Sequence, residues 1–177
     1  MSSVFTIGHS SRPLDEFMAL LDESRIACVI DVRRLPGSRA FPQYDAGALR
    51  ESLARVDIDY MHMDALGGRR GRSLPKDDTR NAMWRNASFR RYADYALTEP
   101  FRDALVQLET RAACERCALM CAEAVWWRCH RRIITDHLLA HGHEVFHIMG
   151  PGKVVAASMT PGARVAGGHV TYPATTP

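Results

Sequence analysis

Five side chains of the kinds used in catalysis and anion binding fall within one short stretch of the chain. A thiol becomes a nucleophile when it loses its proton, a carboxylate or an imidazole can move protons, and a guanidinium can hold an anion. An ordinary surface loop is not expected to combine all of these groups. They are Cys121, Glu123, Cys129, His130 and Arg131.

The sequence on either side of this stretch predicts the elements that position it. Residues 118–122 are an apolar run typical of a buried strand, residues 131–141 carry apolar side chains at helical spacing, and residues 144–148 predict a second strand. Gly142 suits the left-handed residue that ends a helix. In a strand–helix–strand unit, ligands collect at the C-terminal ends of the strands, beside helix N-termini whose free N–H groups favour anions. The five side chains are therefore expected at a ligand site.

Cys121 is a candidate nucleophile because of its place at a predicted strand end. If its thiol faces the following helix N-terminus and Arg131, its pKa is lowered, and the thiolate is the reactive form. The alternative is that Cys121 is a small buried apolar residue, which is the commonest role of a free cysteine. The sequence favours neither interpretation, and Cys129 is a second candidate for the same role.

Cysteine and histidine spacing also raises the question of a metal site. Cys114 and Cys117 form a CxxC pair, and His137 and His141 are one helical turn apart. A CxxC pair that crosses from a helix end into a strand has poor geometry for a zinc knuckle, and no second CxxC pair follows. The two histidines are expected on the solvated face of a helix. We therefore predict no metal ligands and no cofactor, with a structural zinc as the minority interpretation.

Polar side chains also follow two other predicted strands. His9 and Ser10 come after the first apolar run of the chain, and Asp31 and Arg33 end the second, whose nearly continuous pattern is typical of a central parallel strand. A buried carboxylate is costly unless it is paired, so Asp31 and Glu123 should each have an arginine or histidine partner. The alternative is a purely structural ion-pair network, but the convergence of separate segments on one sheet edge favours a functional site.

Residues 64–86 show neither helical nor strand periodicity. A segment of this length is long for a loop inside a compact domain, and such loops are usually functional or disordered. At its start, Gly67, Gly68 and Arg69 could bring backbone N–H groups and a guanidinium around an anion. The alternative is a mobile surface loop, and the general behaviour of loops slightly favours that interpretation.

The composition limits the class of protein. A chain of 177 residues that is 46% hydrophobic is expected to form one domain. No apolar run approaches the length of a membrane span, and the N-terminus enters a strand directly rather than a signal peptide. Five cysteines, an odd number, do not resemble a secreted disulfide framework. We therefore expect a cytoplasmic protein without a membrane partner.

The net charge of +3 is too small to demand a nucleic-acid partner. Lys76 and Lys153 are the lysines of the chain, so nearly all of its positive charge is arginine. Arginine forks suit phosphate and carboxylate, although a genomic composition bias explains the excess equally well. The arginines cluster as Arg69 with Arg70 and Arg72, Arg90 with Arg91, and Arg131 with Arg132.

Strand-like and helix-like segments alternate along the chain. This alternation predicts an α/β fold, a three-layer sandwich with a mainly parallel central sheet. The α/β domain would span residues 1–150. Residues 151–177 would form an extended C-terminal tail packed on it, with residues 170–172 as the candidate strand.

Several short motifs follow one another along roughly the first 150 residues. They are Thr6–Ser10, Asp31–Arg33 with Pro36 and Ser38, Tyr60 with Leu66–Gly68, Cys121–Glu123, Cys129–Arg131, and the strand entry Gly142–Ile148. In this order they resemble a known family of conserved hypothetical proteins, the domain of unknown function 488. The resemblance implies a small bacterial or archaeal α/β domain. It implies no reaction, because none is assigned to the family.

A weaker likeness, at the level of the fold, is to rhodanese and Cdc25-type phosphatase domains. In those domains an Asp-Val-Arg-like element ends an early strand, and a catalytic cysteine, an anion-binding loop with an arginine and a helix come later. Asp31 with Arg33, and Cys121 with Arg131, follow that order. Arg131 lies ten positions after Cys121, whereas the rhodanese loop is short, so the likeness implies a fold and leaves the reaction open.

The leading hypothesis is a small cytoplasmic enzyme, a cysteine-dependent transferase or hydrolase. Its partner would be a small anionic ligand that contains phosphate, a nucleotide or sulfur. The catalytic candidates are Cys121, Glu123, Cys129 and His130, the anion-binding candidates are Arg33, Arg131, Gly67, Gly68 and Arg69, and the supporting residues are His9, Ser10 and Asp31.

Two other hypotheses stay open. In the second, the protein is a nucleic-acid or nucleotide binding module without catalysis, whose arginine clusters contact phosphates while Trp84, Trp126 or Trp127 stacks on bases. In the third, the protein is a partner subunit, with Trp126 and Trp127 as interface anchors.

Overall fold

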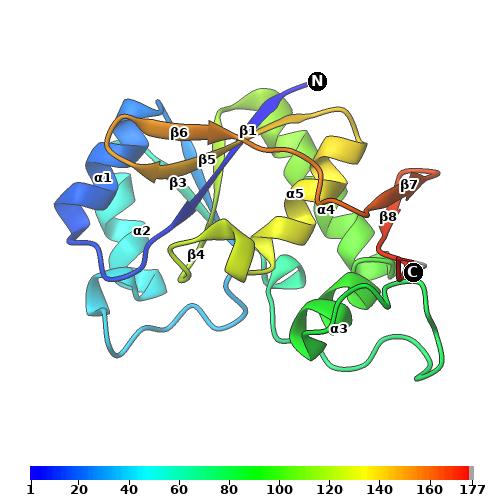
Figure 1. The fold of residues 1–177 in the computed structure, drawn as a ribbon. Coiled ribbons are helices and arrows are strands. Elements are labelled where there is room, and N and C mark those ends of the chain that lie inside the picture. Colours follow the sequence, from blue (N-terminus) through cyan, green and yellow to red (C-terminus); the bar gives the residue numbers. More distant parts are fainter. Residues whose placement is uncertain (176–177) are drawn as a thin grey trace.

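The fold is an α/β sandwich built on one six-stranded sheet (Figure 1). The structure is a computed structural model, and it describes residues 1–175. The strand order is β3-β2-β4-β1-β5-β6; the first five of these run parallel, and β6 pairs antiparallel with β5. The prediction of a single α/β domain with a mainly parallel sheet is confirmed. The strands are β1 (Ser3–Gly8), β2 (Cys28–Asp31), β3 (Asp59–His62), β4 (Cys117–Cys121), β5 (Glu144–Gly150) and β6 (Lys153–Ala156).

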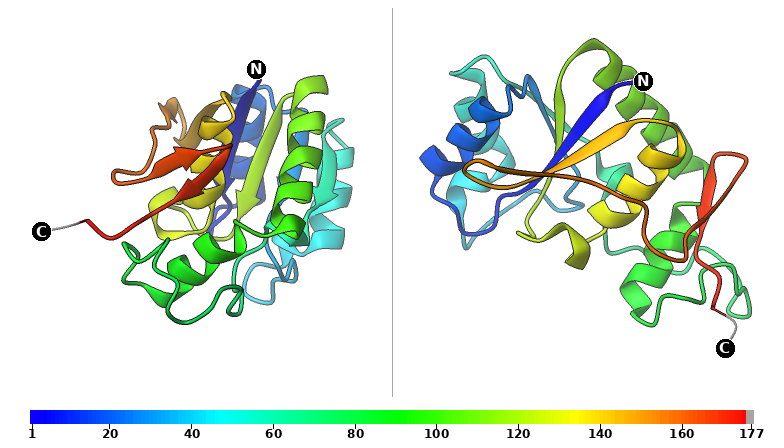
Figure 2. Two further views of the ribbon diagram at one scale, coloured as in Figure 1. Left: turned by 90° about the vertical axis from the view of Figure 1, so that its right-hand side faces the viewer. Right: turned by 45° about the horizontal axis from the view of Figure 1, so that its top comes forward.

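Helices cover both faces of this sheet (Figure 2). On one face, α1 and α2 bury Phe17 and Leu49 against strand residues such as Val29. On the other face, α3, α4 and α5 enclose a second core that includes Ile30 and Leu119. Because both faces are covered, β2 and β4 are buried along their whole length, as their continuous apolar sequences predict. The helices are α1 (Leu14–Glu23), α2 (Ala46–Ala54), α3 (Ala87–Tyr95), α4 (Glu99–Cys114) and α5 (Arg131–Ala140).

The segment after β5 contains more strand than the sequence predicts. β6 extends the main sheet past residue 150, and β7 (Arg164–Ala166) pairs with β8 (His169–Thr171) in a separate hairpin. The strand expected at residues 170–172 corresponds to β8, whereas β6 and β7 were not predicted because all of their side chains are exposed and lack an alternating pattern. The division of the chain at residue 150 stays a prediction.

Residues 64–86 form short turns that pack on the C-terminal hairpin. The 3₁₀ turn η2 (Asp64–Leu66) follows β3. Further along, the Asn81 side chain accepts a hydrogen bond from Tyr172 N–H and donates one to Asp94. Among residues 1–175, no helix combines the length and the apolar character needed to cross a bilayer.

Candidate functional site

The C-terminal ends of β1, β2 and β4 open into one cavity of about 660 Å³. Parallel neighbours place their carboxyl ends at the same sheet edge, so residues far apart in the sequence meet there. Of the residues singled out by the sequence, Asp31, Gly67 and Arg131 do not line the cavity. Those that line it are His9, Ser10, Arg33, Gly68, Arg69, Cys121, Glu123, Cys129 and His130.

Two thiols lie in contact in the wall of the cavity. The Sγ atoms of Cys121, the last residue of β4, and Cys129, just before α5, are 3.3 Å apart. Cys129 Sγ also accepts hydrogen bonds from the backbone N–H and the Nε of Arg131, at 3.3 and 3.2 Å. It therefore occupies the N-terminal end of α5, where free N–H groups and the helix dipole favour negative charge.

The two thiols have opposite acidities. Burial opposes ionisation of Cys129, but the hydrogen bond with Cys121 and the positive charge of Arg131 outweigh it and hold the Cys129 pKa well below its ordinary value. The same hydrogen bond, together with burial, raises the pKa of the Cys121 thiol well above its ordinary value. Cys129 is therefore the thiolate and Cys121 the donor. By sequence, both cysteines are candidate nucleophiles, and Cys121 is the first of them. In the structure, Cys129 is the cysteine whose contacts stabilise a thiolate.

Arg131 holds the loop between β4 and α5, residues 122–130, which carries Cys129 and is called the thiol loop below. Its side chain is 1% exposed, and it donates to Cys129 Sγ, to Thr6 Oγ1 at 3.2 Å and to the Glu123 carbonyl oxygen at 2.6 Å. The loop lies so close to β1 that a Cβ on Gly8 would come within 1.8 Å of that carbonyl oxygen. Arg131 thus positions the thiolate from behind. It does not border the cavity as an anion-binding residue would.

Beneath the thiols, Thr6 connects Arg131 to a buried histidine. Thr6 Oγ1 lies 2.7 Å from His147 Nδ1, and the His147 ring stacks on Trp126 with the ring centres 4.4 Å apart. Burial, helped by Arg131, lowers the pKa of His147 to about 4, so the ring is neutral at pH 7. These contacts hold the loop through neutral groups. The positive charge of Arg131 is therefore not paired with a charged neighbour there and acts on the two sulfurs.

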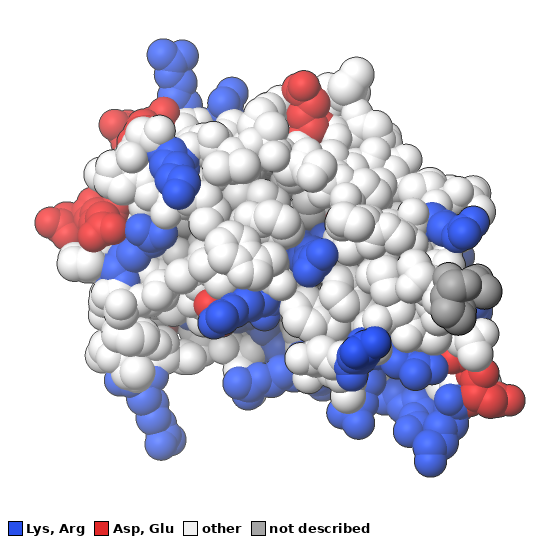
Figure 3. Space-filling model, in the orientation of Figure 1, with Lys and Arg blue, Asp and Glu red and all other residues white. Residues whose placement is uncertain are grey.

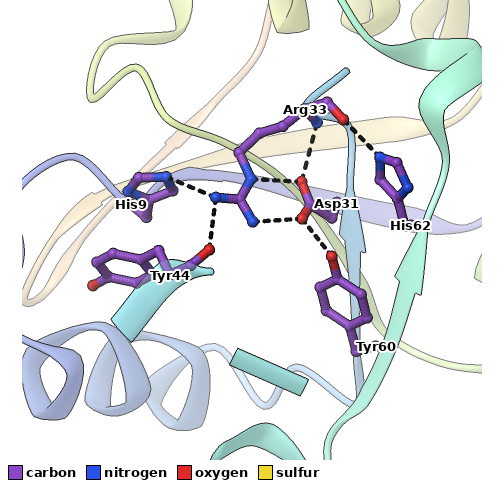
Figure 4. A network of polar contacts seen from close by, with 6 residues as sticks. All are labelled: His9, Asp31, Arg33, Tyr44, Tyr60 and His62. Carbon is purple, nitrogen blue, oxygen red and sulfur yellow. Dashed lines mark hydrogen bonds and ion pairs between the residues drawn. The ribbon is translucent and has the colours of Figure 1, made fainter. Parts of the chain in front are cut away.

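A second polar network lies at the end of β2 (Figure 4). Asp31 is fully buried and accepts hydrogen bonds from Arg33 Nε and Nη2 at 2.9 and 2.7 Å, from the Arg33 backbone N–H, and from Tyr60 Oη at 2.6 Å. The Arg33 Nη1 donates to the Tyr44 carbonyl oxygen at 2.8 Å. Asp31 therefore has the arginine partner that the sequence predicts. Arg33 is committed to neighbours inside the fold, which argues against its predicted role as an anion ligand.

His9 and His62 complete this network (Figure 4). The Nδ1 of His9 donates to the Ser10 carbonyl oxygen, so its Nε2 is the acceptor, 3.4 Å from Arg33 Nη1. Its ring stacks on Tyr44, and burial lowers the His9 pKa. His62 Nε2 donates to the Arg33 carbonyl oxygen at 2.7 Å. The network is structural in its contacts and forms one wall of the cavity.

His130 lines the cavity with a neutral imidazole. Its Nε2 donates to the Val32 carbonyl oxygen at 2.9 Å, which leaves Nδ1 without the proton. Burial lowers the pKa of His130, so the ring stays neutral at pH 7. A Cβ on Gly68 would lie 3.0 Å from this Nδ1. The missing side chain at Gly68 therefore lets its backbone pack against this imidazole nitrogen, which can accept a proton.

Gly67 serves close packing rather than anion binding. A Cβ there would lie 2.8 Å from the backbone N and Cα of Arg34, and its own N–H donates to the Asp64 carbonyl oxygen. Arg69 adopts a left-handed φ of 57° and its side chain is exposed at the cavity rim. Of the three predicted anion-binding residues in this turn, Arg69 alone combines a charge with exposure at the cavity.

Exposed cationic and aromatic side chains surround the mouth of the cavity. Arg34 and Arg128 line it together with Arg69, and all three are exposed. Phe41 and Phe89 also line it and are half-buried. Arg34 and Arg128 were not among the predicted site residues, although each directly adjoins one that was. Glu123 also borders the cavity, but its side chain is exposed, and no arginine or histidine partner of its carboxylate is found among residues 1–175.

The family of the chain follows from a match that spans most of the site. A family model described as a domain of unknown function, DUF488, matches residues 13–138. The chain belongs to this family. The DUF488 match includes both thiols and both buried arginines and begins after Ser10. No curated protein and no solved structure gives a significant match to the chain, so the likeness to rhodanese stays a prediction.

A metal-ligand geometry also occurs in this DUF488 chain, at the opposite end of β4. Among the described residues, Cys28, Glu115 and Cys117 are the group whose ligand atoms lie within 4.8 Å of one another. Cys117 therefore meets Cys28, its register partner on β2, while Cys114 is exposed. Arg111 forms an ion pair with Glu115 there, and a guanidinium competes with a cation. Structural zinc stays a minority prediction.

His137 corrects the prediction of a solvated helix face. His141 is exposed, but His137 is 2% exposed and packs edge-on against Phe101 of α4. Position 137 follows Ile133 by four residues and Ile134 by three, so it shares the apolar face of α5, which packs against α4 and the β8 hairpin. A second cavity, about 530 Å³, adjoins that hairpin and is lined by Gly162, Ala163, Arg164, Pro173, Ala174 and Thr175.

Proposed function

We propose that the protein is a small enzyme that uses the Cys129 thiolate as a nucleophile on an anionic substrate. The observation that carries this proposal is the position of Cys129 at the N-terminus of α5, in the wall of an open cavity. Its sulfur is hydrogen-bonded to both Cys121 and Arg131. A thiolate stabilised in this way is ionised at neutral pH and therefore reactive.

The other cavity residues have distinct roles in this proposal. Arg34, Arg69 and Arg128 attract and hold the anion, because their guanidinium groups are exposed at the mouth. The free Nδ1 of His130 accepts a proton during the reaction, and the exposed Glu123 carboxylate is a second proton carrier. The substrate bears phosphate, a nucleotide or sulfur. A reducing cytoplasm suits this chemistry, since all five cysteines are free thiols.

Alkylation kinetics test the nucleophile. The native protein is treated with iodoacetamide over a series of pH values, and each cysteine is followed by mass spectrometry. We expect Cys129 to react at neutral pH about tenfold faster than in the denatured chain, because more of it is thiolate. The Cys114→Ser variant, which removes the exposed thiol, should keep this rate. Equal rates for native and denatured Cys129 would overturn the proposal.

Turnover is then measured with a panel of anionic substrates. The panel contains a nitrophenyl phosphate, thiosulfate with cyanide as the sulfur acceptor, and an anionic disulfide with a thiol as the reductant, and it distinguishes hydrolase from transferase chemistry. Cys129→Ser should abolish any turnover that Cys114→Ser retains. Turnover that survives in Cys129→Ser would assign the reaction to another group.

The basic surface favours a second candidate function, binding of a nucleic acid. Lysine and arginine side chains gather along the lower edge of the molecule, over α3 and the segment before it (Figure 3). Arg72, Arg85 and Arg91 of this region are exposed. For base stacking, Trp127 is 44% exposed, whereas Trp126 is already stacked on His147. Such binding must weaken steeply as salt rises.

Fluorescence anisotropy with a labelled single-stranded oligonucleotide separates this function from the first. Binding by the basic surface should weaken in Arg85→Ala with Arg91→Ala and stay unchanged in Cys129→Ser. Affinity that ignores both salt and the arginine substitutions would exclude it.

A further inference from the structure

In a mechanism that uses one nucleophile, the second thiol of the cavity serves only as a hydrogen-bond donor to the Cys129 sulfur. Cys121 is 3% exposed, yet it is one of the residues that line the cavity, and its sulfur touches the sulfur of Cys129. We propose that Cys121 and Cys129 form a redox-active dithiol that reduces a small anionic disulfide, with Cys129 attacking and Cys121 resolving. This proposal rests on the function proposed above, because it needs the Cys129 thiolate.

The geometry allows the two sulfurs to bond. A disulfide has an S–S distance of about 2.05 Å, so the 3.3 Å contact closes by little more than 1 Å. Cys121 is fixed at the end of β4, paired with Gly8 of β1, whereas Cys129 follows the short 3₁₀ turn η3 (Trp126–Arg128) and lies outside regular structure. The approach therefore needs movement in the loop and none in the sheet.

The reaction conserves atoms and electrons in two exchanges. In the first, the Cys129 thiolate attacks one sulfur of the substrate R–S–S–R′, forms a mixed disulfide with RS and releases R′S⁻. In the second, Cys121 attacks Cys129 Sγ and displaces RS⁻, which takes the proton of the Cys121 thiol and leaves as RSH. The substrate gains two electrons, and the protein loses them as the Cys121–Cys129 disulfide forms. A cellular thiol reverses the steps and restores the dithiol.

The first exchange prepares the second. The hydrogen bond with Cys129 and the negative charge of its sulfur are two of the three causes that raise the Cys121 pKa, and burial is the other. When Cys129 becomes part of a mixed disulfide, it loses that negative charge. Arg131 stays in place and continues to lower the Cys121 pKa. Cys121 therefore ionises more readily at the moment when a second nucleophile is needed.

The cavity mouth indicates the substrate class. Arg34, Arg69 and Arg128 place three exposed positive charges around the entrance to the thiols. A volume of about 660 Å³ suits a small molecule rather than a folded protein. A low-molecular-weight disulfide with carboxylate groups matches both properties, since guanidinium groups pair with carboxylates in a bidentate manner.

The chain contains a second pair of neighbouring cysteines that serves as an internal control. Cys28 and Cys117 are register partners at the opposite end of β4, and both are fully buried. Neither lines the cavity beside Cys121 and Cys129. A reagent that enters the cavity should therefore oxidise the second pair only after the protein unfolds.

Disulfide mapping in glutathione redox buffers tests the proposal. Oxidised glutathione carries carboxylates and is the probe. After trypsin cleaves at Arg116, Arg128 and Arg131, the bridge would join residues 117–128 to the tripeptide 129–131. We expect this bridge in the wild type and in Cys114→Ser. In Cys121→Ser we expect a stable glutathione adduct on Cys129 instead, because the resolving thiol is absent.

Three results would overturn the proposal or distinguish it from the proposed function. If the wild type accumulates the same Cys129 adduct as Cys121→Ser, Cys129 is a nucleophile but Cys121 does not resolve, so this inference fails and the proposed function stands. If Cys129 forms neither adduct nor bridge and is also inert to iodoacetamide, both fail. If a neutral hydroxyethyl disulfide oxidises the pair as fast as glutathione disulfide does, the anionic substrate class is wrong.

Discussion

At the scale of single residues, Arg131 determines the chemistry of the cavity without entering it. Its guanidinium joins Cys129, Thr6 and the Glu123 carbonyl oxygen, so one side chain links β1, the thiol loop and α5. The thiolate thereby has a positive charge fixed beside it, at a position that substrate does not reach. Arg33 is used in a similar way, because its donors are committed to Asp31 and to the backbone of Tyr44.

Arg131→Lys tests this positioning role. A lysine keeps the positive charge but cannot bond the sulfur, the hydroxyl and the carbonyl together. We expect the pH at which Cys129 alkylates half-maximally to rise and the free energy of unfolding to fall by about 1–3 kcal/mol. Arg132→Lys on the same turn is the matched control and should leave the alkylation profile unchanged. An unaltered profile in Arg131→Lys would show that the helix N-terminus alone stabilises the thiolate.

At the scale of elements, the close approach of β1 to the thiol loop depends on a missing side chain. A Cβ on Gly8 would lie 1.8 Å from the Glu123 carbonyl oxygen and 2.8 Å from the Ala124 Cα, which are backbone atoms that cannot rotate away. Arg131 therefore holds the loop between β4 and α5 against the sheet, and the missing side chain at Gly8 leaves room for this close approach.

Gly8→Ala should displace this loop. Overpacking costs about 1–3 kcal/mol in the free energy of unfolding, and the shifted loop should slow alkylation of Cys129. Gly47→Ala is the control, because nothing lies within 4 Å of a Cβ at that helical position. It should raise the free energy of unfolding by about 0.5–1 kcal/mol, since alanine favours a helix. Chemical denaturation of both variants provides the comparison, and Gly8→Ala with normal stability would refute the argument.

The sequence predicts the elements better than the contacts between them. Continuous apolar runs identify β2 and β4, because a strand buried on both faces needs no alternation. The edge strand β6 gives no such signal, since its side chains are exposed. In the site, the sequence brings Cys121, Cys129 and Arg131 to one sheet edge. It cannot reveal that Arg131 lies behind the sulfurs, because that depends on how closely the loop packs on Gly8.

Two buried histidines make the packing of α5 and β5 sensitive to acid. Burial lowers the pKa of His137 to about 3 and that of His147 to about 4. Below about pH 6.5 both imidazoles are protonated in the unfolded chain and still neutral in the folded chain, so folding stability falls as pH falls. Each histidine weakens the free energy of unfolding by about 1.4 kcal/mol per pH unit until its folded-state pKa is reached.

His137→Leu removes one of these two contributions. Between pH 6.5 and pH 5 its loss of folding stability should be smaller than that of the wild type by about 2 kcal/mol. Thr135→Val alters a neighbouring buried position of α5 that does not titrate, and it should keep the wild-type pH dependence. Urea denaturation at the two pH values decides, and parallel losses in His137→Leu and the wild type would contradict the assignment.

At the scale of the whole molecule, positive charge is distributed toward the side on which the cavity opens. The lower edge of the molecule in Figure 3 is rich in lysine and arginine, although the net charge of the chain is only +3. Exposed charges attract an anionic reagent over a distance limited by salt, about 10 Å at 0.1 M. The surface should thus influence the rate of arrival at the thiols more than their intrinsic reactivity.

Ionic strength separates these two effects. The rate at which Cys129 reacts with 5,5′-dithiobis(2-nitrobenzoate), a dianionic aromatic disulfide, should fall several-fold as the salt concentration rises from about 0.05 to 0.5 M. The rate with neutral iodoacetamide should stay nearly constant. Arg69→Ala with Arg128→Ala should weaken the first dependence, and a salt response shared by both reagents would point to a change in the thiol itself.

The placement of sulfur at both ends of β4 allows local and global opening to be measured in one experiment. Cys129 borders the cavity and can be labelled while the domain stays folded, whereas Cys28 and Cys117 are sealed in the core. In native buffer, Cys28 and Cys117 can then be labelled only when the domain transiently unfolds. When refolding is fast, the labelling rate follows the equilibrium population of the unfolded form. A single time course therefore yields the accessibility of the cavity from one cysteine and the free energy of complete opening from the other two.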